Sequence, residues 1–295
     1  MLGRIPTRWF ALALALWSVV LYLNSLSGTR VYDDKPVLRN PDVTGERPFV
    51  DLFSHDFWGH AMWGGKGWSH LSYRPLAVMT LRLNWFLGDG DLVGFHATNI
   101  AIHTAVVLLA LQLCLRLFPR TRRLEAIAAA FLFASHPLHA EVVSNITGRA
   151  ETLAAACVLA SMLCYVCAFQ ARRKGTEPSV SLRAVLSPTV RELAWVLASG
   201  VCIAGAVLCK ETGLITPGLL GALEVALVLP HIRGPGGDAT TWAGRFRASQ
   251  LGRFLYACCV ALCTPRMVGA IAYGIAGLWF RFRFLPGGYV LCRGS

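Results

Sequence analysis

The sequence predicts an all-α membrane protein with about seven transmembrane helices. Two observations lead to this prediction. Of the 295 residues, 55% are hydrophobic and only 15% are charged, whereas soluble domains carry roughly 25% charged residues. Apolar runs also recur along the chain at close to the ~20 residues that a helix needs to cross a bilayer. A soluble domain of this size has no interior large enough for so much apolar surface.

Seven segments have the length and composition of transmembrane helices. The first is uncharged and follows Arg4 and Arg8, as a signal peptide would, but no small-residue cleavage site follows it. We therefore predict a retained anchor. The ends of the last segment are poorly defined. The segments comprise residues 9–27, 97–118, 124–142, 152–171, 193–209, 214–230 and a stretch within 254–284.

The loops between these segments orient the chain. With alternating spans, the basic-rich connections all fall on one side, which the positive-inside rule makes cytoplasmic. The opposite side receives a 69-residue loop and two shorter connections. The basic segments are the N-terminus and residues 116–123, 172–191 and 233–253, and the opposite connections are residues 28–96, 136–151 and the Lys210–Glu211 turn.

The net charge of +12 is explained by the same pattern. In a soluble domain it would suggest nucleic-acid binding, but here the basic residues flank apolar runs, so no nucleic-acid partner is predicted. Nearly all ten cysteines lie in apolar runs and none in loop 28–96. No disulfide framework is therefore predicted in that loop.

Loop 28–96 carries eight of the sixteen acidic residues and four of the nine tryptophans. Phe49, Leu52, Phe53 and Phe57 recur in it at helical spacing, which favours a helix lying in the membrane interface. The alternative is a structured loop that packs on the bundle. Loops this long in compact proteins are usually functional.

Two adjacent carboxylates, Asp33 and Asp34, lie six residues beyond the first apolar segment. Neighbouring side chains point in different directions, so one carboxylate can face the bundle while the other faces water. Ionisable groups at a membrane boundary are costly unless they serve a function. A turn or helix-capping pair is the alternative interpretation.

One basic residue occurs in each of three connections on the same side as this pair: Arg74 in SYRPL, Arg149 in GRAE and Lys210 in KETG. Cations from three hairpins at one face could form an anion site. Taken singly, each is also explained as a side chain that snorkels to the interface. Lys210 could instead form a turn ion pair with Glu211.

His136, His139 and Glu141 lie together at the end of the third segment. The HxxH spacing puts both rings on one helical face, an arrangement that a metal can use. However, Pro137 interrupts a regular helix and no cysteine is near. We predict hydrogen bonding or substrate contact here and no metal site.

Several sequence blocks, in order and spacing, resemble the membrane half of the TMTC family, the transmembrane and tetratricopeptide-repeat O-mannosyltransferases of the endoplasmic reticulum. The similarity runs from about Tyr22 to Pro217, and the family's HKSYRPL reads HLSYRPL here. The repeats that follow in the family are expected to be absent, since no 34-residue repeat of that kind occurs. The blocks are YDDKPVLRNPDVTG, DFWG, SYRPLAVMTLRLN, FHATNIAIH, ASHPLHAEVVSNITGRAE and KETGLIT.

This resemblance implies a GT-C type glycosyltransferase bundle in the endoplasmic reticulum membrane. Residues 1–295 would form one multi-span domain with a cytoplasmic N-terminus, and loop 28–96 would be its lumenal catalytic loop. The resemblance also implies dolichyl phosphate mannose as donor and Ser/Thr of secretory proteins, notably cadherin-type domains, as acceptors. The implied site consists of the acidic pair Asp33 and Asp34, the phosphate ligands Arg74, Arg149 and Lys210, and support from Tyr73, His136, His139, Glu141, Glu151 and Glu211.

The implied chemistry needs only one carboxylate. A glycosidase uses two because an alcohol leaving group must be protonated, whereas a phosphate-linked donor already has a good leaving group. Asp33 or Asp34 would act as the base for an acceptor hydroxyl that attacks the anomeric carbon with inversion. The basic residues would stabilise the departing phosphate. Nothing in this chemistry demands a divalent metal.

Two other classes of function are weighed. A transporter or channel would need ionisable residues near mid-membrane. The candidates are few: Glu224 lies mid-span and His103 partway along another span, and the sequence alone does not indicate a partner for either. A non-catalytic membrane scaffold of the same family is the stronger alternative, because the repeats are missing. The intact acidic pair argues against a scaffold.

Overall fold

The computed structural model describes residues 5–62, 69–174 and 190–232, and these are helical with no β-sheet among them. Four described segments are long and apolar enough to cross a membrane. They are Thr7–Ser27, which combines α1 (Thr7–Val20) and η2 (Leu23–Ser27); Leu92–Leu117, which is α5; Arg149–Ala171, within α8 (Arg149–Lys174); and Val190–Cys209, which is α10. The prediction of an all-helical, multi-span membrane protein is confirmed.

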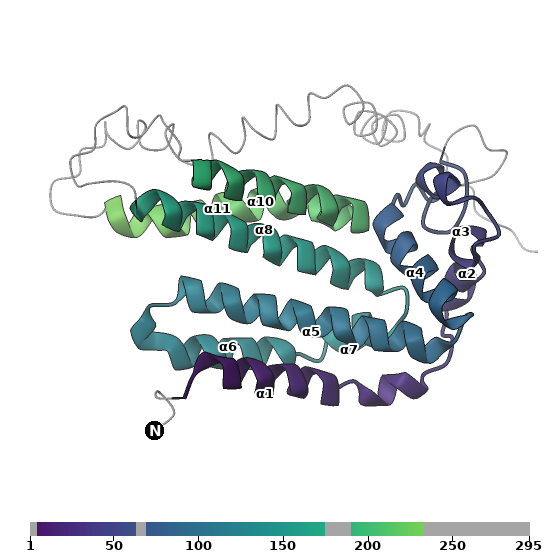
Figure 1. The fold of residues 1–295 in the computed structure, drawn as a ribbon, viewed down its shortest axis with the longest axis horizontal. Helices are drawn as coiled ribbons and strands as arrows, with labels where there is room; N and C mark the ends of the chain where they lie inside the picture. The colour runs from purple at the N-terminus through teal and green to yellow at the C-terminus, as the bar shows by residue number, and fades with distance from the viewer. Residues whose placement is uncertain (1–4, 63–68, 175–189, 233–295) are drawn as a thin grey trace, which may run out of the picture.

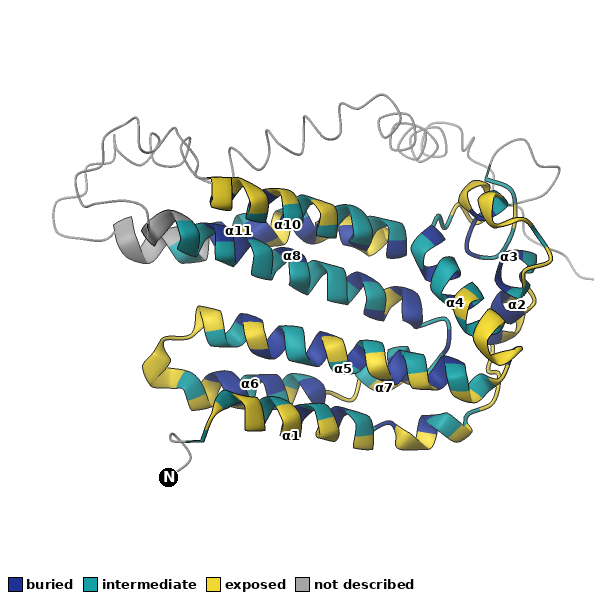
Figure 2. Cartoon of the chain, in the orientation of Figure 1, coloured by how far each residue is buried: buried dark blue, intermediate teal, exposed yellow. Residues whose placement is uncertain are grey.

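The helices run roughly antiparallel in two halves (Figure 1). One half contains α1, α5 and α6 (Arg123–Ala134), and the other contains α8, α10 and α11 (Thr216–Ile232). Contacts between α5 and α8 join the halves, while α8 and α10 form the most extensive helix pair. Outward faces carry exposed apolar side chains such as Leu16 of α1 and Val201 of α10 (Figure 2). Such faces suit a lipid environment.

Small residues bring α8 and α10 close together. The hydroxyls of Ser161 and Ser199 are 2.9 Å apart, and each also donates to the other residue's carbonyl, at 3.2 and 3.1 Å. Both serines are fully buried. A Cβ on Gly205 would lie only 3.4 Å from Cys157 Sγ. Close backbone approach through small residues is the usual basis of helix pairing in membranes.

The segment 124–142 does not form the single span that the sequence predicts. Helix α6 ends at Ala134, a turn follows, and the short helix α7 (His139–Ser144) continues the chain. This turn contains Pro137. The helix is interrupted here because a proline disfavours the helical conformation of the residue before it. At ~1.5 Å per residue, α6 alone is shorter than the ~30 Å hydrocarbon core. Of the remaining predicted spans, 214–230 forms α11, and 254–284 lies outside the described residues.

Loop 28–96 is a small helical unit with a core of its own. It contains α2 (Asp34–Leu38), α3 (Pro41–Thr44), η3 (Phe49–Ser54) and α4 (Pro75–Gly88), and α5 already begins at Leu92. Pro75 at the first helical position starts α4, and a left-handed Asp89 ends it. The core contains Val37, Leu38, Val43, Leu52, Phe57, Ala77, Val78 and Leu81, packed on Phe95, Ile146 and Ala150.

A helix forms at the segment around Phe49, as predicted, but it is short. It is the six-residue 3₁₀ helix η3 between Pro48 and the extended His55, and Phe57 lies beyond it. Leu52 and Phe57 are buried in the core of the loop unit, while Phe49 and Phe53 stay exposed and contact each other edge to face. The burial of Leu52 and Phe57 fits the alternative, a structured loop that packs on the bundle. The core of the loop unit places it firmly against the start of α5 and α8.

Candidate functional site

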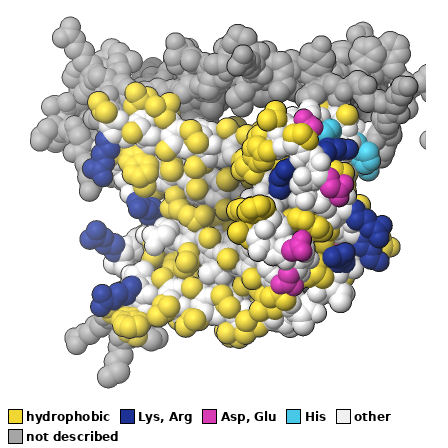
Figure 3. Space-filling model, turned by 45° about the vertical axis from the view of Figure 1, so that its right-hand side comes forward, with side chains coloured by type: hydrophobic (Ala, Val, Ile, Leu, Met, Phe, Trp, Pro, Cys, Tyr) yellow, Lys and Arg dark blue, Asp and Glu magenta, His cyan; other side chains and the backbone are white. Residues whose placement is uncertain are grey.

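The candidate residues gather at one end of the bundle. The N-terminus, the α5–α6 connection and the end of α8 lie at the opposite end (Figure 1). On the face shown in Figure 3, the only charged side chains at that opposite end are Lys and Arg. A broad band of hydrophobic side chains separates them from the other end. All the Asp, Glu and His side chains visible on this face lie at the end with α2, α3 and α4, which we call the loop end. This polarity is what the alternating-span prediction requires.

Asp34 and Asp33 point in different directions, as their adjacency predicts. Asp34 is 1% exposed and accepts hydrogen bonds from the backbone N–H groups of Val31 and Thr147, both at 3.2 Å. Burial raises the pKa of the Asp34 carboxyl, while these two bonds and the nearby His96 oppose the rise. Asp33, in contrast, is exposed and its side chain makes no hydrogen bond with a described residue.

His96 lies beside Asp34 and was not predicted from the sequence. It is 1% exposed, and neither ring nitrogen has a hydrogen-bond partner of ordinary geometry among the described residues. Gly28 packs so tightly against the ring that a Cβ there would lie 3.0 Å from His96 Nε2. The only sign of His96 in the sequence is the FHATN block, which places an ionisable ring near the start of an apolar segment. The histidine therefore completes the buried surroundings of Asp34.

Arg149 is fully buried at the start of α8. Its guanidinium donates to the Asn99 side-chain oxygen and the Phe95 carbonyl, both at 2.8 Å, to the Thr80 carbonyl at 3.2 Å and to the Asn84 side-chain oxygen. The guanidinium also lies over the Phe95 ring, 5.5 Å from its centroid. These bonds join α8 to α4 and α5. Four of the five N–H groups of the guanidinium are thus committed to neutral protein acceptors.

Arg74 and Lys210, the other two predicted cations, each pair with a glutamate. Arg74 makes a two-pronged contact with Glu211, with Nε 3.1 and 3.2 Å from the two carboxylate oxygens and Nη2 3.0 Å from Oε2. Lys210 pairs with Glu151. Both glutamates are about half exposed, at 50% and 45%, whereas Lys210 and Arg74 are 17% and 18% exposed. The turn ion pair between Lys210 and Glu211 is therefore replaced by two ion pairs between different elements.

The short helix η5 (Glu211–Ile215) brings these two ion pairs together. It packs directly on the end of α10, where a Cβ on Gly213 would lie 2.5 Å from Ala206 C and Val207 N. Because only a glycine allows this approach, the KETG sequence can fold back across the loop end. Tyr73, adjacent to Arg74, is half-buried, and burial raises the pKa of its phenol.

The predicted histidine cluster lies where His139 of α7 packs against α5 and α6. His139 packs against His103 and Phe133, with ring centroids 5.1 and 4.7 Å away, and its Nε2 is buried without a hydrogen-bond partner. His136 is exposed, and its Nδ1 accepts a hydrogen bond from the Leu138 N–H. Glu141 is exposed on α7. Among the described residues, no group of three or more His, Cys, Asp or Glu side chains could hold a metal.

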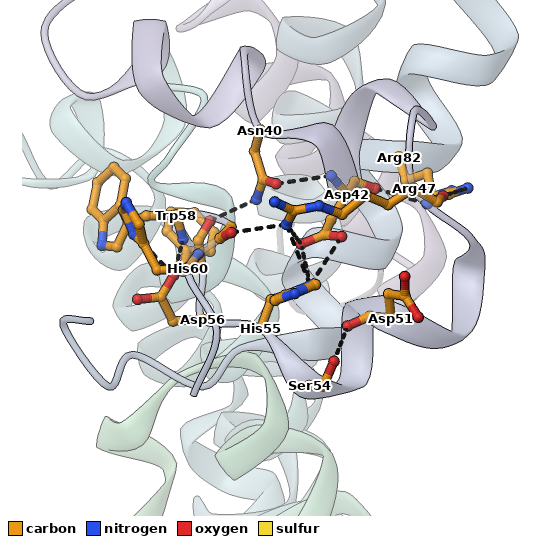
Figure 4. Close-up of polar contacts among 12 residues, drawn as sticks. Asn40, Asp42, Arg47, Asp51, Ser54, His55, Asp56, Trp58, His60 and Arg82 are labelled. Atoms are coloured by element: carbon orange, nitrogen blue, oxygen red, sulfur yellow. Dashed lines mark hydrogen bonds and ion pairs between the residues drawn. The ribbon is translucent and has the colours of Figure 1, made fainter. Parts of the chain in front are cut away.

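Two buried aspartates shape the loop unit (Figure 4). Asp42 lies 3.0 Å from His55 Nδ1 and 3.5 Å from Arg47 Nη1. Asp56 accepts hydrogen bonds from the backbone N–H groups of Trp58 and His60, both at 2.9 Å, and from the Ser69 hydroxyl at 2.7 Å. These contacts fix the chain that directly follows η3, up to His60, and tie it to Ser69. The acidic content of the loop is thus partly structural.

Comparison with known proteins confirms the TMTC resemblance. The chain is 35% identical over 237 residues to protein O-mannosyl-transferase TMTC4 of Homo sapiens, an alignment that covers 76% of this chain and 30% of that protein. It is 36% identical over 207 residues to protein O-mannosyl-transferase Tmtc1 of Drosophila melanogaster, with 70% and 21% covered. For protein O-mannosyl-transferase TMTC3 of Mus musculus the values are 37% over 205 residues, with 69% and 20% covered.

The chain thus spans between 20% and 30% of the length of these relatives, in their N-terminal part. No family model matches it, and no solved structure matches it.

Proposed function

Starting from the homology of this chain to the N-terminal part of the TMTC protein O-mannosyl-transferases, we propose that it is the membrane-embedded catalytic portion of a protein O-mannosyltransferase. The donor would be dolichyl phosphate mannose and the acceptors Ser/Thr side chains of secretory-pathway proteins such as cadherins. The fold would be a GT-C type bundle in the endoplasmic reticulum membrane, with the loop end in the lumen. The placement of Asp33, directly before α2, at the same end of the bundle as the ion pairs of Arg74 and Lys210 carries the proposal.

Asp33 is the proposed base. A base must reach the acceptor hydroxyl, and Asp33 is the exposed member of the acidic pair, with no bond to a described residue. The carboxylate takes the proton while the hydroxyl oxygen bonds to the anomeric carbon and the dolichyl phosphate leaves with its bonding electrons. No general acid is needed, because the phosphate leaves as a stable anion. A positioned base of this kind contributes typically ~10²–10⁴-fold to the rate.

Asp34 is the proposed positioning carboxylate. Its two backbone hydrogen bonds connect the turn before α2 with the turn before α8, although Asp34 and Thr147 are 113 positions apart in the sequence. This connection fixes where Asp33 emerges. Because Asp34 is buried, it has no open path to a bulky acceptor.

Arg74 and Lys210 are the proposed phosphate ligands. Their glutamate partners are more exposed than they are, so a phosphate could take the place of either carboxylate at the cation. Arg149 is better suited to holding α4, α5 and α8 together, since its N–H groups are committed and its side chain is fully buried. The positive charges of Arg74 and Lys210 would stabilise the departing phosphate.

A non-catalytic scaffold is the second candidate, and the same ion pairs favour it, since both cations are already neutralised by glutamates. Steady-state transfer to an acceptor domain separates the two functions. With Arg74→Ala, the donor KM should rise more than about tenfold, the factor that corresponds to ~1.4 kcal/mol. Arg39→Ala, at an exposed arginine of the same loop, is the control and should leave the donor KM unchanged. A scaffold would show no transfer at all, and a change confined to the acceptor KM would contradict the phosphate assignment.

A further inference from the structure

Backbone strain occurs beside the candidate site. Among the described residues, three other than glycine have a positive φ: Tyr32 at 43°, Leu71 at 57° and Asp89 at 47°. Asp89 ends α4, a position where a short polar residue tolerates this conformation. Tyr32 and Leu71 are bulky, and for bulky residues a positive φ is a genuine outlier. Tyr32 directly precedes Asp33, and Leu71 lies three residues before Arg74.

The strain at Tyr32 is imposed by the buried Asp34. Asp34 Oδ2 accepts from the Val31 N–H at 3.2 Å, and the Asp34 N–H donates to the Val31 carbonyl at 2.9 Å. The Lys35 N–H also donates to the Tyr32 carbonyl at 3.3 Å. These bonds close a turn around Tyr32 and leave its backbone in the left-handed region. The turn therefore holds Asp34 inside and presents Tyr32 and Asp33 outside.

Packing does not compensate for this strain. The Tyr32 side chain is 88% exposed, more than any other large hydrophobic side chain among the described residues. It makes no hydrogen bond or ring contact with a described residue. A glycine or asparagine would occupy the position at lower cost. An observed outlier of this kind, next to a proposed reacting group, supports a hypothesis of function.

The surroundings of Tyr32 fit a glycosyl phosphate. Asp33 is exposed beside it, and the cations Arg30 and Lys35 are exposed on either side. A pyranose ring has an apolar face of C–H groups that can pack on an aromatic ring, while the phenol edge stays polar. The phosphodiester is an anion, which favours nearby cations. Base, aromatic face and cations thus occur within six consecutive residues.

We propose that Tyr32 is a substrate-contacting residue whose ring packs against the sugar of the glycosyl phosphate donor beside Asp33. This inference rests on the proposed function and adds to it a determinant of donor specificity. The acceptor hydroxyl approaches from Asp33, and the exposed cations Arg30 and Lys35 flank the sugar. Tyr32 holds the sugar so that its anomeric carbon stays within reach of that hydroxyl.

The test is a kinetic comparison of the unmodified chain with Tyr32→Phe, Tyr32→Ala and Tyr32→Gly in detergent micelles. The probe is a short-chain polyprenyl phosphate mannose with an acceptor peptide. Tyr32→Phe should keep the donor KM within about twofold, because the ring face remains. Tyr32→Ala and Tyr32→Gly should each raise it about tenfold, with the acceptor KM unchanged.

A stability measurement separates the ring from the backbone strain. Tyr32→Gly removes both, so its melting temperature should equal or exceed that of the unmodified chain. Leu71→Gly is the matched control, because it relieves the second strained position without removing an aromatic ring. It should leave the donor KM unchanged.

The outcomes distinguish the inference from the proposed function. An unaltered donor KM in Tyr32→Ala and Tyr32→Gly, with normal transfer by the unmodified chain, would overturn the inference alone. So would a change confined to the acceptor KM, or an effect present in vesicles and absent in micelles, which would make Tyr32 a membrane anchor. If the unmodified chain neither transfers mannose nor shifts its melting temperature with the donor, both proposals fail.

Discussion

Single buried polar residues connect the loop unit to the membrane helices. Arg149 joins three helices through four hydrogen bonds, and Asp34 joins two turns that are distant in sequence. Both groups are almost completely inaccessible to solvent. In a low-dielectric interior such groups are stabilising only when their partners remain in place. The structure of the loop end therefore depends on a few residues.

We predict that Arg149→Met destabilises the protein by at least about 3 kcal/mol, because it leaves two asparagine side chains and two carbonyls without their donor. Arg149→Lys should recover little of this stability, since an ammonium group cannot reach all the acceptors that the planar guanidinium bonds. The measurement is thermal unfolding in detergent, with Arg39→Met at an exposed arginine as control. A melting temperature like that of the control would contradict the structural role.

Asp56 predicts a pH dependence of stability. Burial raises the pKa of its carboxyl, but hydrogen bonds from Ser69, His60 and Trp58, with the nearby His60 ring, outweigh burial and hold the pKa below its ordinary value of 3.8. Its contribution to stability is therefore complete above about pH 3.8 and is lost as the pH falls through the folded-state pKa. Asp56→Asn should lower the melting temperature at pH 7 and reduce the further loss between about pH 4 and pH 2.

Asp34→Asn is the matched comparison for this pH dependence. Because the pKa of Asp34 is raised, the folded protein binds a proton at a higher pH than the unfolded chain does. The pH dependence that Asp34 gives to stability is therefore opposite in sign to that of Asp56. Asp34 thus weakens folding as the pH rises from 3.8 through its folded-state pKa. Equal acid sensitivity of the two variants and the unmodified chain would refute both assignments.

The sequence could predict the opposite directions of Asp33 and Asp34 but not which of them is buried. That choice depends on the Thr147 N–H, which comes from a distant turn. The sequence does not predict the partners of Arg149 either, because the meeting of Asn84 and Asn99 at its guanidinium depends on how α4 and α5 pack together. Tertiary packing also explains why Lys210 and Glu211 do not pair with each other but with Glu151 and Arg74.

At the level of elements, hydrophobic runs located the long helices well, because a membrane span is set by length and apolarity alone. Shorter elements depend on other signals. Helix α4 lies between Pro75 and Gly90, but the aromatic spacing of loop 28–96 does not indicate it. The break in span 124–142 followed from Pro137, a residue that the apolar count ignores. Hydrophobicity therefore predicts spans more reliably than it predicts irregular connections.

The tight contact between η5 and α10 gives an element-scale prediction. Gly213→Ala places a Cβ 2.5 Å from backbone atoms of α10, so η5 must move and the ion pairs of Lys210 and Glu211 must separate. We expect at least a tenfold loss of transfer, about 1.4 kcal/mol or more of transition-state stabilisation, and a lower melting temperature.

Gly200→Ala within α10 is the control, because a Cβ there meets nothing within 4 Å. It should be neutral or slightly stabilising, since alanine favours a helix over glycine. Equal transfer by Gly213→Ala and Gly200→Ala would show that the position of η5 is not needed for the reaction.

At the scale of the whole molecule, the confinement of the visible acidic side chains to one end follows from the sequence order of basic and acidic connections. Alternating spans sort these connections to opposite ends, and the helix arrangement agrees (Figures 1 and 3). A lipid-linked donor suits this architecture, because its tail can stay between helices while its phosphate and sugar reach the loop end. The central claim is that the loop end transfers mannose and that Asp33 is the base.

The most direct measurement is O-mannose on a cadherin domain, determined by mass spectrometry in cells that lack endogenous family members. The unmodified chain should transfer mannose, and Asp33→Asn, which is nearly isosteric, should reduce transfer by at least ~10²-fold at equal expression. Asp34→Asn should retain measurable transfer, because its role is to position the turn. Unchanged transfer by Asp33→Asn, or no transfer by a correctly inserted unmodified chain, would contradict the account.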